Sequence, residues 1–528
     1  MGGGIFQLIA YGSQDVYLTG NPQITFFKAI YSRHSNFAIE SIEQVFKGSP
    51  KFNTKISVNL GRNGDLLHGM VLEADIIAES SKAILVNRPG HALIKFVEIE
   101  IGGQIMDKQY GEWMDLWCQL SHSREKFTKL DNMISGRIKS SVGNNHKLYI
   151  PLQFWFNRNI GLALPLIALQ YHEVKLNVFL NKEGNIRKNH INIESSDKYK
   201  IKSLRLFCDY IFLDTDERRR FAQVSHEYLI DQVQFNSKSI VKNKYKEHEV
   251  KLNLNHPCKE LFWIVQSNLM IGKDMDGIGI YNFPFDYSRP NTADNTTMEL
   301  EKWTFNSLEY WVNRVSKIIF DDENNRIGKW GEDNTFFENA GGTEPIPGDI
   351  NTIKKTVKIY QDNIGDNIKG AVLQLNGADR FSKRTGTYFR VVQPYQHHKG
   401  GYDQQRGLWY SDNFSIDPLI GPSSGEKGYI YNYSFAINPD EHQPSGTCNF
   451  SRIDNAVLRL QMNNVNKEVQ SILDLMEEAL DSDTTDIQYY KELEKKIPNT
   501  PINTIRVYAT NYNVLRITSG MGGLAYSN

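Results

Sequence analysis

The stretch KLYIPLQFWFN at residues 147–157 has a counterpart, GYIYNYSFAIN, at residues 428–438. Both are runs of apolar and aromatic residues that end in a polar turn, and a loop containing Pro165 or Pro444 follows each run. Aromatic and β-branched runs bounded by turn residues are typical of β-strands. A repeated strand of this kind indicates that the chain contains two copies of one β-rich unit.

The segments on either side of this pair recur in the same order. FVEIEIGG at residues 96–103 parallels AVLQLNG at residues 371–377. Both alternate apolar and polar residues and then stop at glycine, as a half-buried strand does before a turn. With about seven or eight strands in each copy, we predict an all-β chain of two eight-stranded antiparallel β-sandwiches, with short helices and long loop insertions. Two further predicted strands correspond between the copies. Residues 168–180 match residues 455–461, and residues 202–213 match residues 503–515.

The composition agrees with a large β-rich protein and excludes several other classes. The 528 residues are too many for one hydrophobic core, and aromatic residues make up 12% of them. A net charge of −1 gives no global attraction to nucleic acid or to an acidic membrane. The sequence lacks an apolar stretch of about 18 residues that could span a membrane. It also lacks the charged start and apolar run of a secretory signal.

The sequence offers no convincing catalytic, cofactor-binding or metal-binding residues, so we predict none and no enzymatic activity. The loop Pro444–Asn449 lacks the Gly-Lys-Ser/Thr of a phosphate loop, and Ser445 lacks the Gly-x-Ser-x-Gly elbow of a hydrolase. A structural turn whose hydroxyls and Asn449 satisfy backbone groups is the better interpretation. None of the histidines belongs to a His-Glu-x-x-His motif, and no cysteine lies at metal-ligand spacing. The histidine pairs considered are His172-Glu173, His226-Glu227 and His397-His398.

Charged and modifiable residues have equally ordinary interpretations. Arg218-Arg219-Arg220 follows two acids on one predicted helix, so we expect ion pairs in a linker and no nucleic-acid contact. The acids at 321–323 and 481–486 indicate solvated loops. The four cysteines lie far apart and are predicted to be reduced, mostly buried thiols of a protein made in the cytosol; they are Cys118, Cys208, Cys258 and Cys448. We interpret the glycosylation sequons as chance matches; they begin at Asn295, Asn413, Asn432 and Asn449.

Several long motifs resemble the major capsid proteins of nucleocytoplasmic large DNA viruses, most closely their mimivirus-like and iridovirus-like branches. The resemblance implies a double jelly roll, three chains in a pseudo-hexagonal capsomer, and capsomers that tile an icosahedral shell of the virion. The repeat described above is what such a fold requires. The motifs are GSQDVYLTGNP (12–22), FWFNRNIGLALP (154–165), the segment 214–230, QPSGTCNFSR (443–452) and YNVLRITSGMGGLAY (512–526).

Combined with the repeat, the resemblance suggests a division of the chain. Asp214 or Thr215 can cap the linker helix, whose first turn holds Asp216 and Glu217. The insertion at 466–498 has apolar residues at helical spacing, and the insertion at 268–356 suits an outward tower. The predicted parts are an N-terminal arm (1–27), a first jelly roll (28–213), a helical linker (214–227) and a second jelly roll (228–528) with insertions at about 268–356 and 466–498.

The N-terminal arm suggests the partners on the inner face. The arm has no Lys or Arg before Lys28, and it carries apolar residues between Ile5 and Ile9. We therefore expect it to dock on minor capsid proteins beneath the shell or on the inner viral membrane, and not on nucleic acid. The alternative is that it covers its own jelly roll. Two other functions remain open: a minor capsid or penton-type jelly-roll protein, and a cellular carbohydrate-binding β-sandwich.

Overall fold

The computed structural model describes most of the two predicted sandwiches. The predicted insertions at 268–356 and 466–498 lie outside the described residues, apart from Phe285 and three short strands in the first of them. These strands are β16 (Ile318–Phe320), β17 (Arg326–Trp330) and β18 (Phe336–Glu338), and they form a separate three-stranded sheet. The described residues are 3–78, 84–86, 88–135, 145–188, 199–242, 247–267, 285, 318–320, 326–330, 336–338, 368–400, 429–462 and 502–526.

The first jelly roll is built from two antiparallel sheets. One sheet has the strand order β1-β11-β3-β7 and the other has the order β2-β9-β5-β6. Their bounds are β1 (Phe37–Gln44), β11 (Tyr199–Leu213), β3 (Leu66–Ala78) and β7 (Asn145–Pro151), and β2 (Lys55–Asn59), β9 (Val174–Leu180), β5 (Ile94–Ile101) and β6 (Gln104–Tyr110). The minor strands are β8 (Leu164–Pro165), which pairs with β3, and the ladder of β4 (Ile84–Leu85) with β10 (Arg187–Lys188).

The second jelly roll repeats this order strand for strand, with sheets β12-β25-β15-β22 and β14-β24-β19-β20. The repeat predicted from the sequence is confirmed, because β7 and β22, β5 and β19, β9 and β24, and β11 and β25 hold equivalent places. The bounds are β12 (His226–Phe235), β25 (Ile502–Thr518), β15 (Pro257–Ser267), β22 (Tyr431–Ser434), β14 (Glu247–Lys251), β24 (Ala456–Met462), β19 (Ile368–Leu375) and β20 (Ala378–Asp379). Shorter strands are β13 (Ser239–Lys242) and β26 (Met521–Leu524) on β25, β23 (Cys448–Asn449) on β15, and β21 (Arg384–Thr385) on β19.

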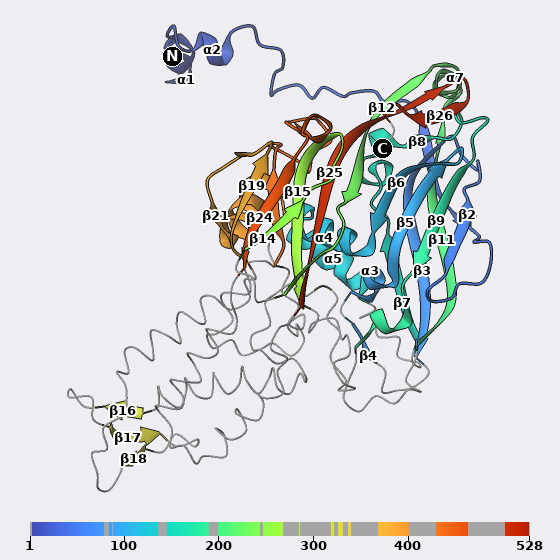
Figure 1. The fold of residues 1–528 in the computed structure, drawn as a ribbon. Coiled ribbons are helices and arrows are strands. Elements are labelled where there is room, and N and C mark those ends of the chain that lie inside the picture. The colour runs from blue at the N-terminus through green and yellow to red at the C-terminus, as the bar shows by residue number, and fades with distance from the viewer. Residues whose placement is uncertain are drawn as a thin grey trace.

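The described helices are short and lie outside the sheets (Figure 1). Asp214, one of the two predicted caps, accepts a hydrogen bond from the Thr215 backbone at 2.8 Å and starts α7 between the two jelly rolls. In the described part of the chain, no helix is long and apolar enough to cross a membrane. The main helices are α1 (Gly3–Ile9), α2 (Val16–Thr19), α3 (Pro89–Leu93), α4 (Gly111–Ser121), α5 (Arg124–Ile134), α6 (Trp155–Arg158), α7 (Thr215–Gln223) and α10 (Gln393–His397).

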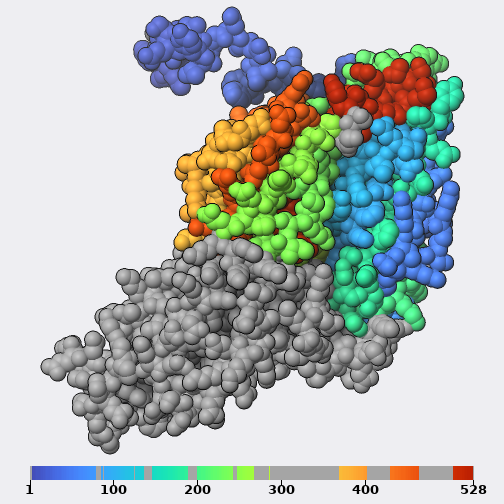
Figure 2. Space-filling model, in the orientation of Figure 1, coloured from blue at the N-terminus to red at the C-terminus, as the bar shows by residue number. Residues whose placement is uncertain are grey.

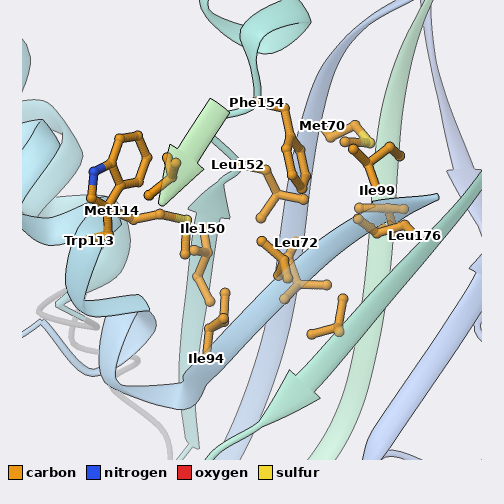
Figure 3. Close-up of a cluster of buried hydrophobic side chains, with 14 of the residues drawn as sticks. Met70, Leu72, Ile94, Ile99, Trp113, Met114, Ile150, Leu152, Phe154 and Leu176 are labelled. Atoms are coloured by element: carbon orange, nitrogen blue, oxygen red, sulfur yellow. The ribbon is translucent and has the colours of Figure 1, made fainter. Parts of the chain in front are cut away.

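Each jelly roll encloses an apolar core. In the first, Leu72, Ile99 and Leu176 point from facing strands into one interior, which α4 closes with Trp113 and Met114 (Figure 3). The second core contains Trp263, which stacks on Tyr431 with ring centroids 6.2 Å apart.

Strand β15 is buried on both faces. Leu261, Trp263 and Val265 point into the second core. Phe262 and Ile264 point the other way and belong to the first cluster, the apolar cluster that contains the core of the first jelly roll. All five side chains are buried. A run of five consecutive apolar residues is the sequence signature of a strand covered on both sides. The sheet β12-β25-β15-β22 therefore packs against its own partner sheet and against the first jelly roll.

We expect truncation of either face of β15 to be costly. Both Phe262→Ala and Trp263→Ala should lower the free energy of unfolding by about 3–5 kcal/mol, because each leaves a cavity in a packed core. Ile240→Ala, at a residue of β13 that is 67% exposed, serves as control and should change it by less than about 0.5 kcal/mol. Chemical denaturation measures all three. A loss near the control value for Phe262→Ala would mean that this face of β15 is not buried.

Candidate functional site: the seam and the N-terminal arm

We call the contact between the two jelly rolls the seam. It joins β6, α4, α6 and the loop at residues 169–173 of the first jelly roll to β12, β15, β25 and β26 of the second. At its centre, the Tyr110 ring lies 5.1 Å from that of Phe235 and 6.0 Å from that of Tyr508. Glu112 binds Arg506 and accepts a hydrogen bond of 2.5 Å from the Tyr508 hydroxyl. Burial and the Glu112 charge raise the pKa of Tyr508 well above its ordinary value, so the phenol stays a donor.

Backbone and side chains interlock where β6 meets β12. Asp107 accepts hydrogen bonds from the Val233 backbone at 3.0 Å and from Gln109 Nε2 at 2.8 Å. In return, Gln232 Nε2 donates to the Met106 carbonyl. Burial raises the pKa of Asp107 to about 6 despite these hydrogen bonds, which act in the opposite direction. Strand β6 of the first jelly roll and strand β12 of the second are thus hydrogen-bonded to each other across the seam.

Two cations meet one buried carboxylate at the same seam. Asp231 of β12 lies 3.2 Å from Arg158 Nη2 of α6 and 3.1 Å from Lys259 Nζ of β15. Lys259 is 1% exposed and also donates to the Pro439 carbonyl at 3.0 Å. A buried ammonium requires such compensation, because an unpaired charge in a protein interior is strongly destabilising.

A second buried charge cluster, around Glu260, lies on the face of β15 that carries Phe262 and is turned toward the first jelly roll. His398 Nδ1 is 2.8 Å from Asp440 Oδ1, and its Nε2 is 3.1 Å from Glu260 Oε2. The Nε2 contact is an ion pair that is not aligned as a hydrogen bond. Burial alone lowers the pKa of His398, but the Glu260 charge and the Asp440 hydrogen bond outweigh burial and raise it to about 9. Close by, the Gly400 backbone donates to the Leu120 carbonyl of α4 at 2.6 Å.

The C-terminal hairpin closes one end of the seam. The Gly520 carbonyl accepts a hydrogen bond from the Tyr171 backbone at 3.0 Å, and His172 Nδ1 lies 3.0 Å from the Gly522 carbonyl. The chain comes so close here that a Cβ on Gly522 would lie 2.7 Å from Leu169 Cδ2. Strand β26 therefore clasps the first jelly roll although it belongs to the second.

The N-terminal arm is the second candidate site, and it stands away from both jelly rolls (Figures 1 and 2). Neither α1 nor α2 has a buried residue. The arm does not cover its own jelly roll, which was the alternative expectation. Its large apolar side chains are solvent-exposed, with Phe26 100%, Phe27 97% and Tyr17 92% exposed. A contiguous set of exposed apolar groups is typical of a docking segment.

The residues weighed as possible chemical sites have structural contacts. Ser445 Oγ accepts from the Asn438 backbone at 2.9 Å and Asn449 Oδ1 from the Ser451 backbone at 3.0 Å, as predicted for a turn. Arg218 pairs with Asp65 at 2.9 Å, which ties α7 to the first jelly roll; its partner is thus not one of the acids on its own helix. Among the described residues, no group of three or more His, Cys, Asp or Glu could hold a metal ion.

The remaining candidates are two histidines, the glycosylation sequons and the two groups of acids. His226 Nε2 contacts the Phe221 carbonyl at 2.8 Å and His397 Nδ1 the Ile437 carbonyl at 2.9 Å. Asn432 is fully buried, whereas Asn449 is exposed. The acids at 321–323 and 481–486 and the sequons at Asn295 and Asn413 lie outside the described residues.

Two jelly rolls of identical strand order that share a buried sheet define a double jelly-roll protein of the type found in viral shells. A family model described as major capsid protein N-terminus matches residues 25–214, and one described as large eukaryotic DNA virus major capsid protein matches residues 217–523. The chain belongs to the family of large eukaryotic DNA virus major capsid proteins.

Individual relatives agree over the full length. The major capsid proteins of Pyramimonas orientalis virus and Paramecium bursaria Chlorella virus 1 are 38% and 35% identical, with all of both chains covered. A solved structure described as a quasi-atomic model of the PBCV-1 virus capsid has a TM-score of 0.61 at 31% identity and covers 96% of this chain and 100% of that one. The chain is thus a structural component of the virion shell and not an enzyme, and the penton-type and carbohydrate-binding alternatives fall away.

The His398 cluster generates a pH prediction. Because the pKa of His398 in the folded protein, about 9, lies above the ordinary 6.5, its stabilisation is fully present below about pH 6.5 and is lost as the pH rises through about 9. Between pH 7 and pH 10, the free energy of unfolding should fall by roughly 1–3 kcal/mol more for the wild type than for His398→Gln. His397→Gln is the matched control and should keep the wild-type slope. Equal slopes for wild type and His398→Gln would contradict the assignment.

Proposed function

We propose that three copies of this chain form a pseudo-hexagonal capsomer that tiles an icosahedral shell of a large double-stranded DNA virus. The observation that carries this proposal is the repeated strand order of the two jelly rolls. A six-sided tile made by three-fold symmetry needs two similar lobes from each chain, and closed cyclic symmetry is the common solution for homo-oligomers. The three chains would then meet through lateral faces of their sandwiches, and each capsomer would contact neighbouring capsomers in the shell.

The seam supports this role because it fixes the two lobes relative to each other. A hexagonal outline is preserved only if the angle between the lobes does not vary from chain to chain. Buried contacts such as Asp107–Val233 and Arg158–Asp231 supply that rigidity, since displacement would leave buried polar groups without partners. We propose the division at 28–213 and 228–528, with 214–227 as the linker, as the two lobes of this tile, and the stretch 268–356 as the outward tower.

We further propose that the arm, residues 1–27, docks on minor capsid proteins beneath the shell or on an inner viral membrane. Its exposed apolar residues have no cover of their own, and its first basic residue is Lys28. An arm that binds a packaged genome directly needs cations to neutralise phosphates, and this arm has none. Synthesis in the host cytoplasm fits the four free cysteines, because reduced thiols persist in that compartment.

The capsomer proposal predicts the mass of the assembled unit. Protein released from purified particles should be a homotrimer of 60.7 kDa chains, because each trimer supplies the six lobes of one tile. Light scattering over a range of concentrations measures this mass. A persistent monomer at every concentration would count against the capsomer.

The arm proposal predicts an effect on assembly that leaves the trimer unchanged. Deletion of Met1–Ala10 should weaken particle assembly, because it removes apolar groups that dock outside the trimer. Replacing Ile5, Phe6, Leu8 and Ile9 by Ser is the length-matched control and should act in the same way. Normal particles from both variants would refute docking.

The wild type should show negligible DNA affinity near physiological salt; micromolar binding that strengthens as salt is lowered would show a nucleic-acid contact instead.

A further inference from the structure

Two of the four cysteines face each other across an antiparallel ladder. Cys258 of β15 and Cys448 of β23 are direct register partners. Both carry free thiols. Cys258 is fully buried within the second core, and Cys448 is half-buried and packs against the same core. Residues far apart in the sequence thus present their sulfur atoms to the same face of the sheet.

The ladder geometry suits a covalent bond between these residues. Directly opposed residues of antiparallel strands have Cα atoms about 4.5–5.5 Å apart, and disulfides span Cα distances of about 4.4–6.8 Å. The other two cysteines have no such arrangement. Cys208 of β11 faces Ile42 and Met70 in its ladder, and Cys118 lies within α4.

We propose that Cys258 and Cys448 form an intramolecular disulfide when the protein meets an oxidising environment. The oxidant is a small disulfide such as oxidised glutathione. The Cys448 thiolate attacks it, forms a mixed disulfide and releases one glutathione. The Cys258 thiolate then attacks the sulfur of Cys448 and releases the second glutathione. The two protons of the protein thiols pass to the two glutathione thiols, so one disulfide is formed for each one reduced.

The order of attack follows from exposure. Cys448 is the half-buried member of the pair, so the reagent meets it first, while Cys258 reaches only its ladder partner. Burial raises the pKa of both thiols. Because the thiolate is the attacking species, the bond should form slowly at neutral pH and faster in mildly alkaline solution.

The bond would secure a weakly held element. Strand β23 has two residues. The segment after it is held beside the start of β15, because the Phe450 backbone donates to the His256 carbonyl at 3.1 Å and the His256 backbone donates to Ser451 Oγ at 2.8 Å. A disulfide here closes a long loop that includes the insertion at 268–356, and long loops give the larger stabilisation. A shell protein made in a reducing compartment would thus gain stability after its release.

The experiment counts thiols in purified full-length protein before and after exposure to oxidised glutathione at pH 8.5. The protein is then denatured, alkylated with a maleimide and analysed by non-reducing peptide mass spectrometry. Wild type should fall from four alkylated thiols to two, with a Cys258–Cys448 peptide, while Cys118 and Cys208 stay alkylated. The unfolding midpoint should rise by about 5 °C or more and return on reduction.

Cys448→Ser is the control at a half-buried position, where replacement should leave the fold intact. This variant should keep its three thiols and show no change in the unfolding midpoint on oxidation. Wild type that keeps all four thiols after prolonged oxidation would overturn the proposal. A stable glutathione adduct on Cys448 without the Cys258–Cys448 peptide would also overturn it, because the second attack would then not take place.

Discussion

The two-sided burial of the sheet β12-β25-β15-β22 is the constraint on which the rest of the structure depends. Within β25, Val507 belongs to the second core and Tyr508 to the first cluster, and β15 alternates in the same way. A sheet covered on both faces cannot shift by one residue, because a slip would exchange its two sets of side chains. The two jelly rolls therefore form one body around a shared layer.

Buried charge gives this packing its specificity. Asp231 pairs with Arg158 and Lys259, and His398 lies between Glu260 and Asp440, so these two buried clusters bring opposite charges together beside the seam. Buried ion pairs contribute little net stability compared with apolar packing, but losing one partner is expensive. Apolar burial supplies the stability of the seam, while the ion pairs penalise other orientations of the two lobes.

The N-terminal arm differs from the jelly rolls in exposing its large apolar side chains. The jelly rolls bury large side chains such as Trp113 and Trp263, while the arm exposes Phe26 and Phe27 to solvent. Exposed aromatic side chains on a segment without its own core are typical of a surface that another molecule covers. The chain thus consists of a body built from the two packed jelly rolls and an arm whose apolar side chains are exposed.

The repeat, the strands and the linker helix could be predicted from the sequence, because alternation in FVEIEIGG and capping by Asp214 are local properties of the chain. The run LFWIV at residues 261–265 also indicated a strand buried on both faces, a signal that the prediction of half-buried strands did not use. Only the tertiary structure decided which residues meet. Arg506 binds Glu112 at a separation of 394 positions, and Cys258 faces Cys448. No local periodicity encodes such contacts, because they depend on which strands pair within a sandwich and on how the two sandwiches pack, and not on the residues beside them in the chain.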